Sequence, residues 1–352
     1  MASQRKSFNV AGPSHLTHVD WSNFSHRRSV AASLVKGVYI HEQDRQQCCH
    51  GGDGGGAVAT SRWWESFGFQ LKQELVDEKD KSIFGAVYEL KSSSCQAQAQ
   101  AQTQAYKPPK LVIAFRGTLI KKKRLVQDFR LDHRIIQRTL HKSDRVRDGL
   151  QAVHTAVSKV GAENVWLAGH SLGSSIALLV GRNMVKMGYC LETYLFNPPF
   201  VSVPTQIIKN PKLQEGIRLA HTAVKAGMAV AMSIVNKKIV EDNNEEFSLL
   251  SPWIPYLFIN PSDPICAEYL EYFQHRERMV AAAGEIGRLA AQNSVRCMVA
   301  NAMGKDCKPS HLIPSAYLTI NLNGSPVSEW EAHKLSQWWH PDLKLDHKLY
   351  QL

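Results

Sequence analysis

Residues 165–179, Val-Trp-Leu-Ala-Gly-His-Ser-Leu-Gly-Ser-Ser-Ile-Ala-Leu-Leu, decide the predicted fold of this 352-residue chain. Val165 to Ala168 is a short apolar run typical of a buried strand, and a helical pattern begins at Ser174. Between them, Gly169 to Gly173 match the pattern G-x-S-x-G. In this pattern Gly169 and Gly173 remove the Cβ clashes that would otherwise forbid a sharp turn. The stretch therefore predicts a strand, a tight turn and a helix in immediate succession.

Ser171 is the central residue of that turn. Its hydroxyl is expected to project at the N-terminus of the following helix, where the helix dipole favours developing negative charge. We therefore predict that Ser171 is a nucleophile. The alternative is an ordinary N-cap serine at a glycine-rich helix start. The strand candidate directly before the motif and the helix directly after it favour the nucleophile.

Along the rest of the chain, short β-rich runs alternate with helical patterns, which is typical of βαβ units around a mainly parallel sheet. Strands are predicted at Ile83 to Leu90, Leu111 to Phe115, Val165 to Ala168, Thr193 to Phe196, Trp253 to Ile259 and Ala316 to Leu322. Helices are predicted at His26 to Tyr39, Val146 to Val160, Ser174 to Met187, Leu213 to Val235 and Met279 to Met303. The alternation predicts an α/β fold.

Residues 1–352 are expected to form one domain, because a chain of this length with 44% hydrophobic residues can build a single large core. Two low-complexity stretches, residues 48–56 and 92–105, can bury little apolar surface and are predicted to be surface loops. Residues 198–251 interrupt the alternation with helical patterns alone. They form a candidate cap or lid insertion, and packing of the same helices into the core is the alternative.

Several separate segments resemble the class 3 lipases, the fungal triacylglycerol-lipase type of α/β-hydrolase. Leu111 to Thr118 resembles the strand and oxyanion loop of that family, and Ala168 to Ala177 resembles its nucleophile turn. His26 to Tyr39 and Glu331 to Leu343 resemble a plant subgroup sometimes labelled GDSL esterase/lipase, although no Gly-Asp-Ser-Leu motif occurs here. The resemblance implies an α/β-hydrolase fold, a mainly parallel sheet flanked by helices, and hydrolysis of carboxylic esters of lipid-like molecules.

An oxyanion hole is expected because acyl transfer places negative charge on a carbonyl oxygen, and loss of one aimed donor costs about 3 kcal/mol. The turn geometry assigns one donor to the backbone N–H of Leu172, the residue after the nucleophile. The resemblance implies that Thr118 is the second donor and that Asp128 steadies its loop. The alternative for Thr118 is an ordinary residue at a strand end.

The acid and the base should follow the serine in chain order, each on a loop after a later strand. Asp263 comes directly after the strand candidate that ends at Ile259, so we predict that it is the acid; a structural turn is the alternative. His333 follows the last strand candidate and lies in the segment that resembles the plant subgroup, so we predict that it is the base. Lys334 and Ser336 depart from the subgroup pattern, which expects glycine and a second histidine. His340 is the alternative base.

The formal net charge of +11 is concentrated in one part of the chain. Residues 121–147 hold ten Lys and Arg against three Asp, a local net charge of +7. No aromatic platform or nucleic-acid motif accompanies the cluster, so nucleic acid is not an expected partner. A solvated basic face is one interpretation. The other is peripheral contact with an anionic membrane through the residues nearest the oxyanion loop: Lys121, Lys122, Lys123 and Arg124.

The remaining features bear on location and cofactors. The N-terminal residues lack the continuous apolar segment of a secretory signal, and no later stretch supplies about twenty uncharged apolar residues. A cytoplasmic protein is therefore expected. Seven irregularly spaced cysteines indicate reduced thiols, not a disulfide framework or a zinc site. The expected chemistry needs no metal or organic cofactor. A lipase-like binding or signalling protein without turnover is the alternative function, although candidates for every catalytic group occur in the required order.

Overall fold

A central β-sheet organises the computed structural model, which describes residues 7–49, 62–91, 106–119, 143–200, 245–278, 313–323 and 328–351. Within these residues, strands β1 to β8 form one sheet in which each strand pairs with its neighbours in the sequence. The strands are β1 (Phe69–Val76), β2 (Ile83–Leu90), β3 (Leu111–Phe115), β4 (Val165–His170), β5 (Glu192–Phe196), β6 (Tyr256–Ile259), β7 (Ala316–Asn321) and β8 (Leu345–Tyr350). Strands β3 to β7 are parallel, whereas β1, β2 and β8 pair antiparallel.

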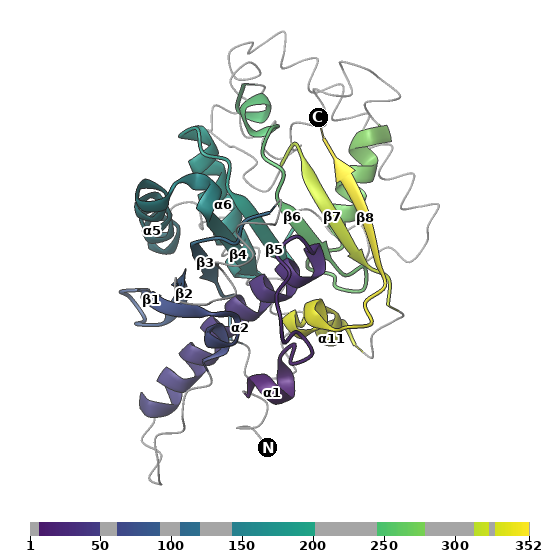
Figure 1. Cartoon of the computed structure of the whole chain (residues 1–352). Helices are drawn as coiled ribbons and strands as arrows, with labels where there is room; N and C mark the ends of the chain where they lie inside the picture. The colour runs from purple at the N-terminus through teal and green to yellow at the C-terminus, as the bar shows by residue number, and fades with distance from the viewer. Residues whose placement is uncertain are drawn as a thin grey trace.

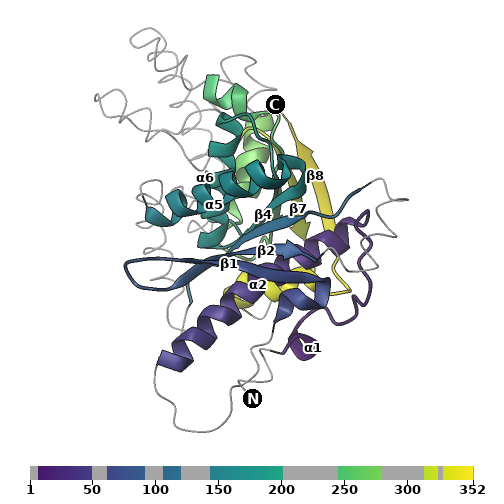
Figure 2. The ribbon, with the colours of Figure 1, turned by 60° about the vertical axis from the view of Figure 1, so that its left-hand side comes forward.

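Helices cover both faces of the sheet (Figures 1 and 2). The helical elements are α1 (Phe8–Ala11), α2 (Phe24–Cys49), η2 (Trp63–Phe67), α5 (Asp144–Val160), η4 (Ala162–Asn164), α6 (Leu172–Lys186), α11 (Glu329–His333) and η6 (Leu335–Trp339). Figure 2 shows α5 and α6 on one side of the sheet and α2 on the other. Residues 245–250 and 268–278 are also helical.

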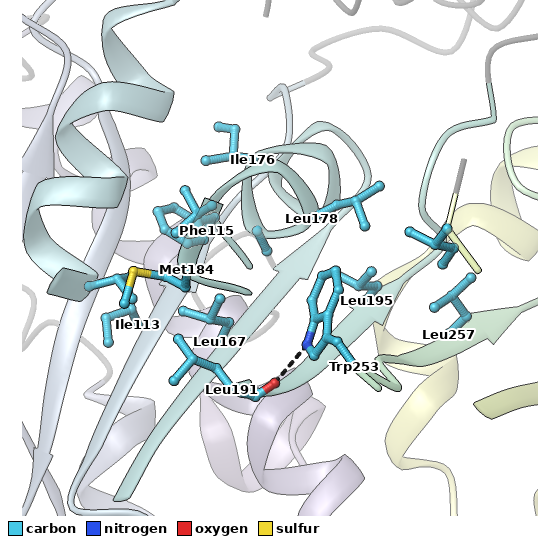
Figure 3. Close-up of a cluster of buried hydrophobic side chains, with 14 of the residues drawn as sticks. Ile113, Phe115, Leu167, Ile176, Leu178, Met184, Leu191, Leu195, Trp253 and Leu257 are labelled. Carbon is cyan, nitrogen blue, oxygen red and sulfur yellow. Dashed lines mark hydrogen bonds between the residues drawn. The ribbon is translucent and has the colours of Figure 1, made fainter. Parts of the chain in front are cut away.

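Alternation along the parallel strands divides the core into two layers, because successive side chains of a strand point to opposite faces. On β3, Ile113 and Phe115 pack in the layer of α5 and α6, whereas Val112 and Ala114 pack in the layer of α2. Figure 3 shows part of the first layer, where Trp253 donates a hydrogen bond from Nε1 to the carbonyl oxygen of Leu191 at 2.9 Å. A sheet buried on both faces is typical of parallel strands.

The predicted α/β fold is confirmed: a mainly parallel sheet flanked by helices, with a tight turn between β4 and α6. The bounds of β2 and β3 are those expected from the sequence. β6 begins at Tyr256 and not at Trp253, because Pro255 has no N–H to donate to a neighbouring strand. β1 and β8 were not predicted. They are antiparallel edge strands whose side chains are mostly exposed and polar, so the apolar signal that marks the central strands is missing.

Several sequence predictions fall wholly or partly outside the described residues. The expected surface loop at 48–56 was wrong at its first two residues, since α2 continues through Cys49. The rest of that loop, the loop at 92–105, and the helices expected at 213–235 and 279–303 lie outside the described residues. Of the candidate cap at 198–251, the structure describes 198–200 and 245–251, and residues 245–250 are helical as expected.

Candidate active site

The turn between β4 and α6 holds Ser171 in a strained backbone conformation. Ser171 has φ 55° and ψ −127°, a region that side-chain-bearing residues rarely adopt. The flanking glycines are required by close approach: a Cβ at Gly169 would lie 2.4 Å from the carbonyl oxygen of Gly173, and one at Gly173 would lie 2.3 Å from that of Phe115. The glycines therefore allow the turn, and the turn presents Ser171 at the first residues of α6.

The hydroxyl of Ser171 is buried and makes no hydrogen bond with any part of the chain that the structure describes. Buried polar atoms without a partner are rare in folded proteins and cluster at functional sites. α6 begins at Leu172, whose backbone N–H has no carbonyl partner within the helix because it belongs to the first turn. An unpaired hydroxyl therefore lies next to a helix N-terminus.

Asp263 lies in the turn after β6 and is fully buried. Its Oδ1 accepts a hydrogen bond from the backbone N–H of Ile265 at 3.0 Å, and its Oδ2 accepts one from Cys266 Sγ at 3.2 Å. Oδ2 also lies 2.8 Å from Nδ1 of His333. Burial alone would raise the pKa of Asp263, but His333 and the hydrogen bonds from Ile265 and Asn197 outweigh it and hold the pKa below its usual value. The carboxyl group is therefore ionised at neutral pH.

His333 is the last residue of α11, in the segment after β7, and is buried. Since Asp263 is ionised, Nδ1 of His333 donates to it, and Nε2 is the nitrogen that can accept a proton. The imidazole ring of His333 lies 4.9 Å, between centroids, from that of His170, the residue before Ser171. The structure thus brings the predicted acid and base together, near the predicted nucleophile. The alternative base His340 has an exposed side chain, whose Nδ1 accepts a hydrogen bond from the backbone N–H of Asp342 at 3.3 Å.

Asn197 is a residue of the site that the sequence analysis missed. It is fully buried directly after β5, with φ 46°. Its Nδ2 donates to Asp263 Oδ2 at 2.7 Å and to the carbonyl oxygen of Ala332 at 3.1 Å, and its Oδ1 accepts from Trp338 Nε1 at 2.7 Å. One amide thus ties the acid to the segment that carries His333. Its position just past a predicted strand was the available signal.

The loop after β3 carries the predicted oxyanion donor. Gly117 packs against the nucleophile turn, because a Cβ there would lie 2.9 Å from both Ser171 Cβ and the carbonyl oxygen of His170. Thr118 follows it and is exposed. Asp128 and the basic residues 121–124 lie outside the described residues. The structure therefore puts the start of the predicted oxyanion loop beside Ser171.

The sheet explains why these residues meet. Gly117, Ser171, Asn197, Asp263 and His333 each follow the carboxyl end of one strand of the parallel set β3 to β7. The carboxyl ends of parallel strands share one edge, where such folds bind ligands. An ionised carboxylate, an imidazole and a strained serine at this edge are the groups needed for acyl transfer through a covalent intermediate.

His170 is a second buried histidine of the site, and it makes the folded protein sensitive to acid. Burial, and then the proximity of His333, lower the pKa of His170 from 6.5 to about 3. Between these two values the unfolded chain binds a proton that the folded protein does not. The free energy of unfolding must therefore fall as the pH falls through this range.

Acidification from pH 6.5 to pH 5 is expected to cost the protein about 2 kcal/mol of stability through His170. Urea unfolding at both pH values measures this loss. The variant His170→Gln has no titrating group at this position, so its loss should be smaller by about that amount. An equal loss in the two proteins would contradict the assignment, since every other titrating group is common to both.

The described residues contain no group of three or more His, Cys, Asp and Glu side chains arranged to hold a metal ion. No helix among them is both long enough and apolar enough to cross a membrane.

This chain is similar to a known protein family, to a plant protein and to a solved structure. The family model described as lipase (class 3) matches residues 112–206, which include all of β3 but its first residue, together with Ser171 and Asn197. A protein of Arabidopsis thaliana named as a GDSL esterase/lipase is 40% identical over 357 residues, covering 100% of this chain and 99% of that protein. A solved structure of a fungal esterase from Rhizomucor miehei covers 96% of this chain and 94% of its own, with a TM-score of 0.32 and 14% identity.

Proposed function

This chain belongs to the class 3 lipase family of ester hydrolases, and we propose that it cleaves carboxylic esters of lipid-like molecules with Ser171 as nucleophile, Asp263 as acid and His333 as base. One observation carries the proposal: the buried 2.8 Å hydrogen bond between Asp263 and His333, next to a serine in a strained turn. Strain of this kind persists only where the surrounding structure holds it, and it is concentrated at functional sites.

The first half of the reaction acylates the enzyme. Nε2 of His333 removes the proton of Ser171 Oγ as the oxygen attacks the ester carbonyl carbon. Asp263 stabilises the imidazolium that results, because its carboxylate is ionised and fully buried. When the tetrahedral intermediate collapses, the proton of His333 goes to the departing alcohol, and the acyl group stays on Ser171.

The second half releases the acid. His333 removes a proton from water, the hydroxide oxygen attacks the acyl carbon, and Ser171 leaves with the proton that His333 returns. In both halves the backbone N–H groups of Leu172 and Thr118 would hold the oxyanion. The position of Gly117 against Ser171 supports this role for the loop. These steps use only the chain's own residues.

The proposal is tested by reacting purified protein with a fluorophosphonate, which phosphonylates activated serines, and mapping the modified peptide by mass spectrometry. Modification at Ser171 of native protein, and none after heat denaturation, is the expected result. Turnover of p-nitrophenyl esters from acetate to palmitate then identifies the preferred acyl length, and the lipid-like assignment requires a preference for the longer chains.

A folded protein that neither reacts with the fluorophosphonate nor turns over any ester would instead support a lipase-like binding protein without turnover. Peripheral contact with anionic membranes through residues 121–124 stays a prediction from the sequence.

A further inference from the structure

Three hydrogen bonds connect the oxyanion loop to the segment that carries His333. The backbone nitrogen of Gly117 lies 2.7 Å from Tyr39 Oη. Tyr39 Oη lies 2.8 Å from Nδ1 of His170, and Nε2 of His170 lies 2.8 Å from the carbonyl oxygen of His333. Tyr39 comes from α2, so the chain of bonds joins an N-terminal helix to the ends of β3, β4 and β7.

The direction of each bond follows from the groups involved. A carbonyl oxygen can only accept, so Nε2 of His170 carries the hydrogen and donates to His333. Nδ1 of a neutral imidazole is then an acceptor and takes the hydroxyl hydrogen of Tyr39. The Tyr39 oxygen in turn accepts the N–H of Gly117. With a neutral imidazole, each of these hydrogens has one acceptor, and no second arrangement of the protons satisfies all three bonds.

The two side chains in this series of hydrogen bonds also keep one protonation state at neutral pH. Burial lowers the pKa of His170 to about 3, so its imidazole stays neutral at neutral pH. Burial raises the pKa of Tyr39 well above its usual value, so the phenol stays protonated. Neither residue serves as an acid or a base at neutral pH, and the bonds keep their direction.

From these contacts we propose that Tyr39 and His170 are positioning residues that lock the oxyanion loop to the segment of the general base. The inference rests on the proposed function, since it assigns Gly117 and Thr118 to the oxyanion loop and His333 to proton transfer. His170 adjoins Ser171 in the sequence, so one chain of bonds sets the relative positions of donor loop, nucleophile and base.

The contacts of Gly117 show why the hydroxyl of Tyr39 matters. The carbonyl oxygen of Gly117 accepts a hydrogen bond from Arg116 Nη1 at 2.7 Å, while its N–H donates to Tyr39. Without the hydroxyl, the peptide between Arg116 and Gly117 loses the acceptor for its N–H, and Gly117, which precedes Thr118, is held only through its carbonyl oxygen. A misplacement of 1 Å at a catalytic group can cost about 100-fold in rate.

The test replaces Tyr39 by phenylalanine, which removes one oxygen and keeps the ring. Tyr39→Phe is expected to lower kcat for a p-nitrophenyl ester roughly 10- to 100-fold and to leave KM within about twofold of wild type, because the loop acts on the transition state. The rate of fluorophosphonate labelling should fall in parallel. Tyr88→Phe is the matched control: Tyr88 is fully buried on β2, and its hydroxyl has no partner within the described part of the chain.

Wild-type kcat in Tyr39→Phe would overturn the inference, and so would an equal loss in Tyr88→Phe. Failure of the proposed function looks different: the wild type itself would neither label nor turn over, and the inference would fall with it.

A second variant, His170→Asn, separates positioning from general damage. If Tyr39→Phe does not fold, His170→Asn alone is expected to lower kcat roughly 10- to 100-fold with KM within about twofold of wild type, and an unchanged kcat would overturn the inference. His170→Asn keeps an acceptor near Nδ1 for Tyr39 but loses the donor to His333. If the three bonds act as one unit, Tyr39→Phe combined with His170→Asn should lose no more activity than the worse single variant. Losses that multiply would show two independent effects and overturn the inference.

Discussion

Replacement of Ser171 by alanine is expected to lower kcat for ester hydrolysis by about a million-fold, the loss typical when a serine nucleophile is removed. The fold should persist, because alanine keeps the Cβ and the flanking Gly169 and Gly173 still relieve the turn. The free energy of unfolding should even rise, by about 1 kcal/mol, since the buried hydroxyl of Ser171 has no partner whose bond would be lost. Catalytic activity therefore falls while stability rises, as expected for a side chain that serves catalysis at a cost in stability.

Ser33→Ala is the matched control for this pair of measurements. Ser33 is fully buried in α2, and its hydroxyl has no hydrogen-bond partner among the described residues, as at Ser171. Its replacement should raise stability by a similar amount and leave kcat unchanged. Ester turnover and urea unfolding of both variants provide the comparison. Residual activity of more than about one per cent in Ser171→Ala would rule out Ser171 as the nucleophile.

Replacement of His333 by asparagine is expected to cause a loss of kcat of the same order, about a million-fold. The asparagine amide can still donate to Asp263 from near the position of Nδ1, but it has no basic nitrogen in place of Nε2. Asp263 would also keep its bonds from Asn197, Ile265 and Cys266, so the buried carboxylate stays satisfied and the fold is retained. The variant therefore removes the base alone.

His340→Asn is the control, because the sequence analysis left His340 as the alternative base. Its side chain is exposed, and Asp342 Oδ2 lies 4.0 Å from its Nδ1. An unchanged kcat in His340→Asn, beside the loss in His333→Asn, is the expected pair of results. The reverse pair would transfer the role of base to His340 and contradict the mechanism.

The sequence predicted the parts of the fold in which local pattern and burial agree. β3 and β4 are apolar on both faces, and the nucleophile turn between β4 and α6 is specified by glycines that no other residue can replace. β1 and β8 escaped prediction because an edge strand needs few apolar side chains; its stability comes from one neighbouring strand and from solvent-exposed polar residues. The register of an edge strand with its neighbour cannot be predicted from a short stretch of sequence.

The residues of the candidate site likewise fall into those that the sequence predicted and those that it did not. Ser171, Asp263 and His333 could be proposed because each follows a recognisable strand in the expected chain order. Asn197 also follows a recognisable strand, but its role, like that of Tyr39, depends on partners far away in the sequence. Nothing near Tyr39 in α2 indicates that its hydroxyl meets Gly117 and His170. Contacts of this kind appear only once the sheet has brought the strand ends together.

The amide of Asn197 has a consequence for how the protein acquires activity. The partners of its side chain lie 66, 69, 135 and 141 residues further along the chain. Contacts between such distant segments incur a larger loop-closure entropy than local ones, so we expect them to form later in folding than the turn after β4. A nascent or partly refolded chain can therefore contain the nucleophile turn well before it contains an oriented base. Ester hydrolysis is therefore expected only after these distant segments have come together, so that incompletely folded chains are inactive.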